Sequence, residues 1–163
     1  MDAITVLAAS VNEPLLRTIG LILDDSLVYG FVILAFLFIG EMRWSKRLKV
    51  MLALALALLL ATGLKYAMAE ERPCAGQDWC PEDYALPSLH ATAAFTLMIA
   101  FLNKRTYPLY LLFALFVCFT RLNLGVHYFQ DIVGALPVAL LSYYLVDIAW
   151  KSTRAKEAKK DGF

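Results

Sequence analysis

Residues 50–64 read VMLALALALLLATGL and contain no charged side chain. Such a run approaches the roughly 20 apolar residues that a helix needs to cross a bilayer. Four further runs of similar character belong to a chain in which 61% of the residues are hydrophobic. A backbone inside lipid must satisfy its own hydrogen bonds, so these runs have to be helices. The sequence therefore predicts an all-α fold, a polytopic membrane helix bundle.

We expect about five transmembrane helices, several of which must extend into polar flanks to reach the length of a span. Their predicted ranges are 26–42, 50–68, 88–102, 107–122 and 131–150. Residues 1–25 alternate apolar and polar side chains, which favours an N-terminal amphipathic helix on the membrane surface or dipping partly into it. This start lacks the basic beginning and clean apolar core of a secretory signal. Residues 1–150 are predicted to form one membrane domain, followed by a basic cytoplasmic tail at 151–163.

Most basic side chains gather on one side of this predicted topology. Of the 15 lysines and arginines, 11 fall between the first two helices, between the third and fourth, or after the fifth. They are Arg43, Lys46, Arg47, Lys49, Lys104, Arg105, Lys151, Arg154, Lys156, Lys159 and Lys160. The positive-inside rule assigns this side to the cytoplasm. We therefore expect a multi-pass protein of the cell membrane with a cytoplasmic C-terminus.

Three cations break this rule. Lys65, Arg72 and Arg121 lie at or beyond the predicted outer ends of the second and fourth helices. Each one alone is explained by a side chain that snorkels to the lipid headgroups. Together they share the outer side with His90 and His127, the two histidines of the chain. Cations at the membrane edge without a topological role are candidates for function.

Two segments place some of these groups on helix ends. In LKYAMAEERPC, Lys65 and Arg72 are seven residues apart, close to two helical turns, before Pro73 ends the helix. In ALPSLHATAAF, Ser88 is a predicted N-cap, and the free N–H groups of such a helix start can bind an anion. His90 follows in the first turn. The alternative for this residue is a buried, hydrogen-bonded structural histidine.

The segment TRLNLGVHYFQD places Arg121 at the end of the fourth helix and His127 four residues before Asp131. At that spacing Asp131 can hold one ring nitrogen of His127, which leaves the other free to attack or to accept a proton. A purely structural His–Asp pair is the alternative. Taken together, the three segments predict an outer pocket for a tetrahedral anion. No carboxylate cluster for Mg²⁺ or Zn²⁺ accompanies them, so no metal or other cofactor is expected.

These three segments resemble the signature of the type 2 phosphatidic acid phosphatase (PAP2) superfamily, written K-x6-R-P, P-S-G-H and S-R-x5-H-x3-D. Here they read Lys65 to Arg72-Pro73, Pro87-Ser88-Leu89-His90, and Thr120-Arg121 to His127 to Asp131. Every internal spacing matches, and the resemblance covers residues 65–131. Leu89 replaces the usual glycine and adds bulk where a phosphate is expected. Thr120 replaces the usual serine and keeps a hydroxyl.

The resemblance implies a role for each motif residue. His127 would be the nucleophile that forms a phosphohistidine, oriented by Asp131. His90 would protonate the leaving oxygen and then activate water. The phosphoryl oxygens would be held by Lys65, Arg72, Ser88 and Arg121.

The expected function is that of a membrane phosphatase acting on a lipid-linked phosphate or diphosphate, with polyprenyl (undecaprenyl) diphosphate preferred. Phosphatidylglycerol phosphate and phosphatidic acid are the alternatives. More remote are a non-enzymatic anion-binding membrane protein and vanadate-dependent haloperoxidase chemistry, which uses a similar pocket in soluble proteins. The expected partners are the lipid phosphate substrate and membrane lipids, with no nucleic acid. Formation of a homo-oligomer is left open.

Two cysteines in the predicted outer loop, Cys74 and Cys80, bracket the segment AGQDW. On the oxidising side of a membrane such a pair can form a disulfide, and two free thiols are the alternative. A zinc site is disfavoured because no third or fourth ligand stands nearby. Cys118, inside the fourth predicted helix, is expected to be a packing residue.

Overall fold

The computed structural model describes residues 2–160, with side chains described through residue 156. Over this range the protein consists of seven helices and has no strand. They are α1 (Ala3–Ser10), α2 (Pro14–Asp24), α3 (Ser26–Gly40), α4 (Trp44–Met68), α5 (Leu89–Ala100), α6 (Tyr107–Asn123) and α7 (Phe129–Lys160). The prediction of an all-α helix bundle is confirmed.

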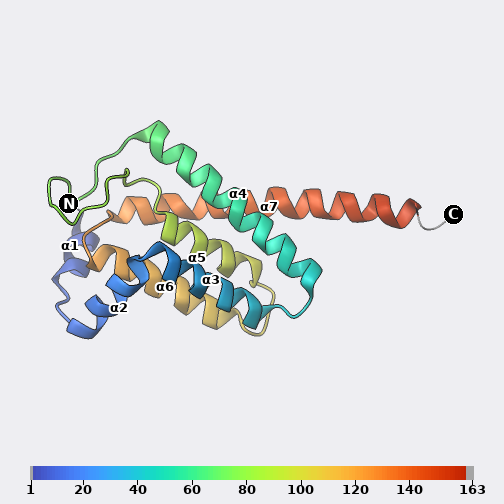
Figure 1. The fold of residues 1–163 in the computed structure, drawn as a ribbon, viewed down its shortest axis with the longest axis horizontal. Helices are drawn as coiled ribbons and strands as arrows, with labels where there is room; N and C mark the ends of the chain where they lie inside the picture. Colours follow the sequence, from blue (N-terminus) through green and yellow to red (C-terminus); the bar gives the residue numbers. More distant parts are fainter. Residues whose placement is uncertain (1, 161–163) are drawn as a thin grey trace.

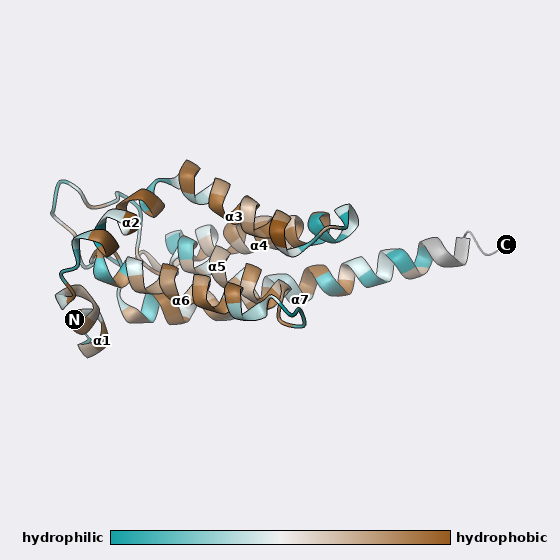
Figure 2. Cartoon of the chain, turned by 90° about the horizontal axis from the view of Figure 1, so that it is seen from below, coloured by the Kyte–Doolittle hydropathy of each residue, from teal (hydrophilic) through white to brown (hydrophobic). Residues whose placement is uncertain are grey.

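Helices α3 to α7 form an elongated bundle in which α5 packs against α3, α4, α6 and α7 (Figure 1). Helices α4 and α7 are long and apolar enough to cross a membrane. Helices α3, α5 and α6 are also apolar but have 15, 12 and 17 residues. Hydrophobic residues follow the helices, whereas hydrophilic ones gather in the connections and the later part of α7 (Figure 2). Leu59 and Leu112 are among the large apolar side chains exposed on the outside, where lipid would cover them.

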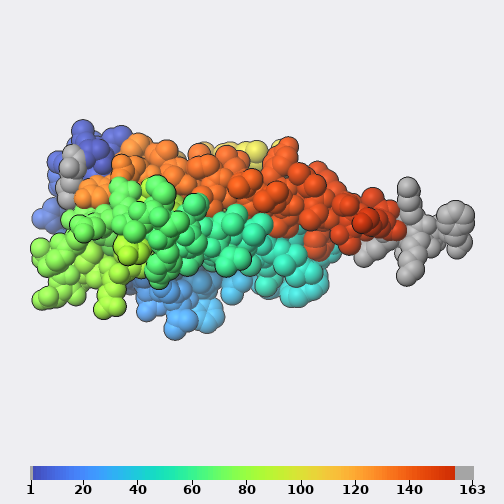
Figure 3. All heavy atoms as spheres, turned by 90° about the horizontal axis from the view of Figure 1, so that it is seen from above, coloured from blue at the N-terminus to red at the C-terminus, as the bar shows by residue number. Residues whose placement is uncertain are grey.

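Alanines allow the longest helices to pack closely. Ala53, Ala57 and Ala61 recur every four residues along α4 and are fully buried. Ala135 and Ala139 do the same in α7. Small residues at helix interfaces are typical of membrane proteins, because lipid chains remove the hydrophobic drive for helix association and close packing must replace it. Figure 3 shows α4 and α7 lying side by side on one face of the molecule.

Two helices extend beyond their predicted ranges. Helix α4 begins at Trp44 rather than at residue 50, and α7 runs from Phe129 to Lys160 rather than from 131 to 150. The predicted ranges followed hydrophobicity, whereas Lys, Arg, Glu and Ala are strong helix formers that continue a helix into water. Residues 151–160 of the predicted basic tail are therefore helical. Residues 161–163 lie outside the described residues.

The first 25 residues form two helices where one was expected. Helices α1 and α2 meet at 112°, and Pro14 occupies the first position of α2, a place that suits proline. Thr5 is fully buried and accepts the N–H of Phe129 at 3.0 Å. The Asn123 side chain donates to the carbonyl of Ala8 at 2.9 Å. The N-terminal segment is thus part of the folded end of the bundle.

The two ends of the bundle differ in content. Helices α1 and α2, the 69–88 connection and the start of α7 share one end, on the left in Figure 1. The α3–α4 and α5–α6 connections and the end of α7 lie toward the other. The predicted cytoplasmic cations therefore lie away from the end that carries Lys65, Arg72 and Arg121.

Candidate active site

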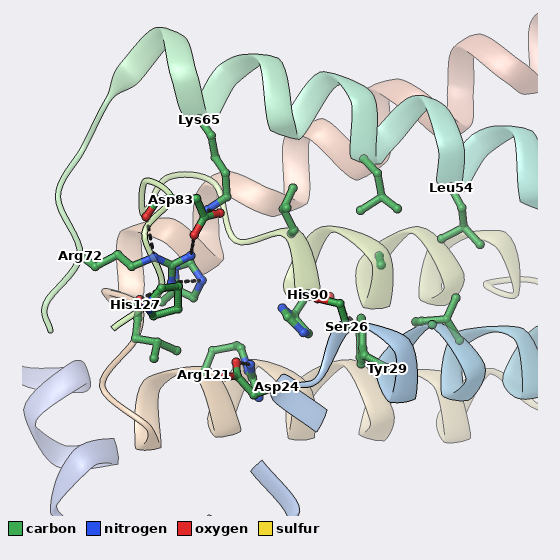
Figure 4. Close-up of a pocket in the computed structure, with 17 residues that line it drawn as sticks. Asp24, Ser26, Tyr29, Leu54, Lys65, Arg72, Asp83, His90, Arg121 and His127 are labelled. Carbon is green, nitrogen blue, oxygen red and sulfur yellow. Dashed lines mark hydrogen bonds and ion pairs between the residues drawn. The ribbon is translucent and has the colours of Figure 1, made fainter. Parts of the chain in front are cut away.

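A cavity of about 580 Å³ opens at the end of the bundle that carries the motif residues. Its polar part is lined by Lys65, Arg72, His90, Arg121 and His127. Its apolar part continues between α3, α4 and α5 along Ile33, Leu54, Leu58 and Ala93. In Figure 4, Leu54 lies on one side of His90, and on the other side lie Lys65, Arg72, Asp83 and His127. The cavity thus joins a cationic site to an apolar channel between helices.

The ring of His127 lies between an acceptor and a donor. Its Nδ1 atom is 3.1 Å from Oδ2 of Asp131, and its Nε2 atom is 3.2 Å from a terminal nitrogen of Arg72. A carboxylate can only accept and a guanidinium can only donate, so Nδ1 carries the proton and Nε2 presents its lone pair. Asp131 is fully buried and also accepts the N–H of Tyr128 at 2.8 Å. The pair therefore fixes both the orientation and the tautomer of His127.

The charge state of His127 agrees with this tautomer. His127 lies in the connection between α6 and α7 and is almost fully buried. Burial, followed by the nearby cations Arg72, Lys65 and Arg121, holds the pKa of His127 well below its usual value of 6.5. The imidazole is consequently neutral at neutral pH, which is the form that can act as a nucleophile.

His90 belongs to the first turn of α5. Ser88 caps that helix by accepting the N–H of Ala91, and the Tyr29 hydroxyl donates to the carbonyl of His90 at 2.7 Å. The rings of Tyr29 and His90 lie 4.4 Å apart, centroid to centroid. His90 lines the cavity, and its buried Nε2 atom has no hydrogen-bond partner within the described protein. This nitrogen is therefore free to exchange a proton with a ligand.

Lys65 and Arg72 are held by the connection between α4 and α5. The Nε atom of Arg72 donates to the carbonyl of Asp83 at 2.8 Å, and a terminal nitrogen donates to the carbonyl of Val126 at 2.9 Å. Lys65 donates to the carbonyl of Tyr84. The Asp83 carboxylate also pairs with both cations, at 2.9 Å from Nζ of Lys65 and through the other oxygen with Arg72.

Arg121, at the end of α6, has a carboxylate partner of its own. One terminal nitrogen lies 2.5 Å from Oδ1 of Asp24, and the other donates to the carbonyl of Gly20 at 2.8 Å. Its buried Nε atom has no partner among the described residues. The sequence analysis missed Asp24, Asp83 and Tyr29. Both aspartates lie on the predicted outer side of the membrane, together with the three cations that lacked a topological role. This shared location was the feature of the sequence that could have predicted the ion pairs.

Ser88 and the two departures from the motif occupy distinct places. Ser88 is fully buried behind the cavity wall, where its N–H donates to the carbonyl of Asp131 at 3.1 Å. Leu89 lines the cavity. The Thr120 hydroxyl donates to the carbonyl of Val117 at 2.8 Å, so it turns back onto its own helix and away from the site. Five of the seven predicted site residues thus reach the cavity, while Asp131 and Ser88 support it from behind.

Cys74 and Cys80 are joined by a disulfide in the connection that supplies Arg72 and Asp83. Cys118 is a buried free thiol in α6. Across the described residues, no group of three or more His, Cys, Asp or Glu side chains could hold a metal ion.

Comparison with known families decides the classification of this site. The family model described as the PAP2 superfamily matches residues 46–154, which is more than half of the chain and contains all seven predicted site residues. The chain belongs to the PAP2 superfamily. The resemblance inferred from the three short segments is confirmed, and those segments supply the three cations and both histidines that line the cavity.

Curated relatives of this PAP2 chain include human "Sphingosine-1-phosphate phosphatase 2", 35% identical over 78 residues, or 42% of this chain and 20% of the human protein. An Escherichia coli relative, "Putative undecaprenyl-diphosphatase YbjG", is 26% identical over 113 residues, or 64% of this chain and 57% of that protein. The chain therefore spans about a fifth of the first relative and just over half of the second.

Two solved structures share the PAP2 fold of this chain. A phosphatidylglycerolphosphate phosphatase from Bacillus subtilis has a TM-score of 0.68 at 22% identity, covering 92% of this chain and 84% of the other. Aquifex aeolicus LpxE has a TM-score of 0.71 at 21% identity, covering 88% and 92%. The fold of the bundle is therefore that of PAP2 membrane proteins.

Proposed function

We propose that this chain is a membrane phosphatase that hydrolyses a lipid-linked phosphate or diphosphate through a phosphohistidine intermediate. The observation that carries this proposal is the position of the His127 ring between Asp131 and Arg72, which sets its tautomer. Its Nε2 lone pair faces the cationic part of the cavity, while Asp131 accepts the proton on Nδ1. A protein that only bound anions would gain nothing from an oriented, neutral imidazole beside its cations.

The reaction divides into two steps. In the first, Nε2 of His127 attacks phosphorus, the P–O bond to the lipid breaks, and His90 gives a proton to the departing oxygen. In the second, water attacks the phosphohistidine, the N–P bond breaks, and His90 takes the proton from water. Lys65, Arg72 and Arg121 stabilise the charge that develops on the phosphoryl oxygens, and Ser88 supports the α5 helix start beside them.

The apolar part of the cavity supports a lipid substrate. Ile33 of α3 and Leu54 and Leu58 of α4 line it, and these residues lie along helices whose outer surfaces are apolar. A headgroup can therefore reach the cations while its hydrocarbon stays between helices. The basic connections at the opposite end support a site on the extracytoplasmic side of the cell membrane, with the C-terminal end of α7 in the cytoplasm.

Polyprenyl diphosphate is the substrate we favour. The E. coli relative that matches 64% of this chain carries the name of an undecaprenyl-diphosphatase. Phosphatidylglycerol phosphate or phosphatidic acid is the alternative, supported by the shared fold with the B. subtilis phosphatidylglycerolphosphate phosphatase. Each substrate would present a terminal phosphate to the same cations.

The test is phosphate release by purified protein in excess EDTA from four substrates: undecaprenyl diphosphate, phosphatidylglycerol phosphate, phosphatidic acid and diacylglycerol diphosphate. We expect hydrolysis that EDTA does not abolish, with the highest kcat/KM on undecaprenyl diphosphate. The His127→Ala protein is the matched control. Release of phosphate from none of the four substrates, or activity that requires added Mg²⁺, would contradict the proposal.

A further inference from the structure

Each phosphate-binding cation of the proposed site already has a carboxylate partner. Asp83 pairs with Lys65 and Arg72, and Asp24 pairs with Arg121 (Figure 4). Neither aspartate belongs to the motifs that supply the cations. With the buried Asp131, the site holds three cations and three carboxylates, so its formal charges cancel while the histidines are neutral.

This balance has a physical reason. Three cations buried at the end of a membrane bundle would be costly without counter-ions, because removing charge from water is unfavourable unless it is paired. A bound phosphate dianion would supply the same compensation. The dianion cannot bind while all three carboxylates remain in place, since like charges within a few ångströms in a partly buried site repel strongly. Phosphate and the aspartates therefore compete for the same cations.

Asp83 and Asp24 are the carboxylates whose side chains can move away from the cations. Their side chains are 33% and 37% exposed, whereas that of Asp131 is fully buried. Burial raises the pKa of Asp83, but the hydrogen bonds from Lys65 and Arg72 outweigh burial and hold that pKa below its usual value. Asp83 is therefore charged, and because its side chain is 33% exposed, the carboxylate can rotate away from the cations toward solvent.

The three cations also have hydrogen-bond acceptors other than these carboxylates. Arg72 donates to the carbonyls of Asp83 and Val126, and Lys65 donates to the carbonyl of Tyr84. Arg121 is held in the same way by the carbonyl of Gly20. These backbone acceptors are neutral, so rotating the aspartate side chains away removes negative charge without removing the hydrogen bonds that orient the cations.

We propose that Asp83 and Asp24 are exchangeable counter-ions, which tetrahedral oxyanions displace on binding and which displace the phosphate product when they return. This inference rests on the proposed phosphatase function for its role in turnover. It makes the two aspartates determinants of affinity for phosphate groups, without contact between them and the reacting atoms. The exchange limits product inhibition in a site whose cations would otherwise hold inorganic phosphate tightly.

The experiment measures binding of inorganic phosphate by calorimetry to the purified full chain in detergent. Asp83→Asn and Asp24→Asn keep the size of the side chain and remove its charge. We expect each to tighten the Kd about tenfold, a change equivalent to ~1.4 kcal/mol. Glu82→Gln and Asp25→Asn are matched controls on neighbouring acids outside these ion pairs, and their Kd should stay at the wild-type value. Unchanged or weaker binding in either site variant would overturn the exchange for that residue.

A second measurement uses the wild-type chain and does not depend on the folding of variants. Carbodiimide-driven amine labelling of carboxylates, read by mass spectrometry, should modify Asp83 and Asp24 faster in sulfate than in chloride at equal ionic strength. Glu82 and Asp25 should be unaffected. Equal labelling in both salts would overturn the inference. Tighter phosphate binding in the variants of a protein that hydrolyses none of the lipids would preserve the inference and defeat only the proposed function.

Discussion

The Nδ1 atom of His127 lies 3.1 Å from Oδ2 of Asp131, and the same oxygen accepts the N–H of Tyr128 at 2.8 Å. One carboxylate oxygen therefore holds both the nucleophilic ring and the backbone beside it. The other oxygen is buried and has no partner within the described chain. An asparagine can reproduce both hydrogen bonds with its single carbonyl oxygen, so substitution at this position separates orientation from charge.

Asp131→Asn should fold normally and form phosphoenzyme slowly. The amide keeps the Nδ1–H tautomer of His127 but loses the charge that stabilises the positive phosphohistidine. We expect a loss of about 10²–10³-fold, the range for removing one electrostatic stabiliser from an active site. Rapid-quench measurement of phosphoenzyme formation tests this, and thermal unfolding serves as the folding control. A rate within a few-fold of wild type would show that the charge of Asp131 is not used.

The two histidines should differ in their response to the leaving group. His127→Ala should abolish turnover of every substrate, because no phosphoenzyme can form. His90→Ala should lose about 10²–10⁴-fold on a lipid phosphate, whose alkoxide leaves poorly without a proton. Nitrophenyl phosphate releases nitrophenolate, which leaves well without a proton. With this substrate, the first step of the reaction should largely survive in His90→Ala.

The second step still lacks its base in His90→Ala, so phosphoenzyme should accumulate from nitrophenyl phosphate. It should be stable in alkali and labile in acid, as a phosphohistidine is. Radiolabelled phosphate retained on the protein after denaturation is the measurement. Equal losses on both substrates without trapped label would reject this division of roles, and label trapped on His127→Ala would identify a different nucleophile.

Activity should persist at pH values where a free imidazole is already protonated. The pKa of His127 lies well below 6.5, and the neutral form attacks. As pH falls, the active form is therefore retained through 6.5 and is lost only at lower pH. The rate of phosphoenzyme formation by His90→Ala, measured against pH with nitrophenyl phosphate, isolates this titration. Titration of the substrate in parallel is the control. An acid limb centred at or above 6.5 would contradict the expectation.

The cavity should face outward. Glu82 is exposed beside Asp83, so Glu82→Cys, in a chain without the three native cysteines, should react with an impermeant thiol reagent in intact cells. Arg105→Cys, also exposed but in the α5–α6 connection, should react only after lysis. The reverse pattern would invert the proposed topology.

Gly40, at the end of α3, should not tolerate a side chain. A Cβ atom there would lie 2.0 Å from the Tyr110 hydroxyl and 2.6 Å from the Phe101 ring. Both rings are almost fully buried, so Gly40→Ala should destabilise the protein by about 1–3 kcal/mol, as overpacking does. Gly63→Ala is the matched control, since its added Cβ meets nothing within 4 Å. Denaturant unfolding in detergent should separate the two variants, and equal stability would refute the predicted clash.

Local spacing explains which parts of the site were predictable. His127 and Asp131 are four residues apart, a spacing that allows their side chains to pair, so the sequence predicted this contact although His127 lies just before the start of α7. Arg121 and Asp24 are 97 residues apart, and no local pattern joins them. Asp83 meets Lys65 and Arg72 through the path of a loop, which hydrophobic periodicity does not encode. The helices were predicted from their apolar residues. Apolar residues mark only the membrane-crossing part of a helix, so the polar ends of α4 and α7 were missed.

The hydrogen bond from the Ser88 N–H to the Asp131 carbonyl joins the start of α5 to the start of α7. Ser88 caps the helix that carries His90, and Asp131 orients His127, so this one hydrogen bond links the supports of the two histidines. Helices α3 and α4, which border the apolar channel, take no part in this link. The distance between the two histidines is therefore set where α5 and α7 begin, apart from the α3 and α4 side chains that line the apolar channel.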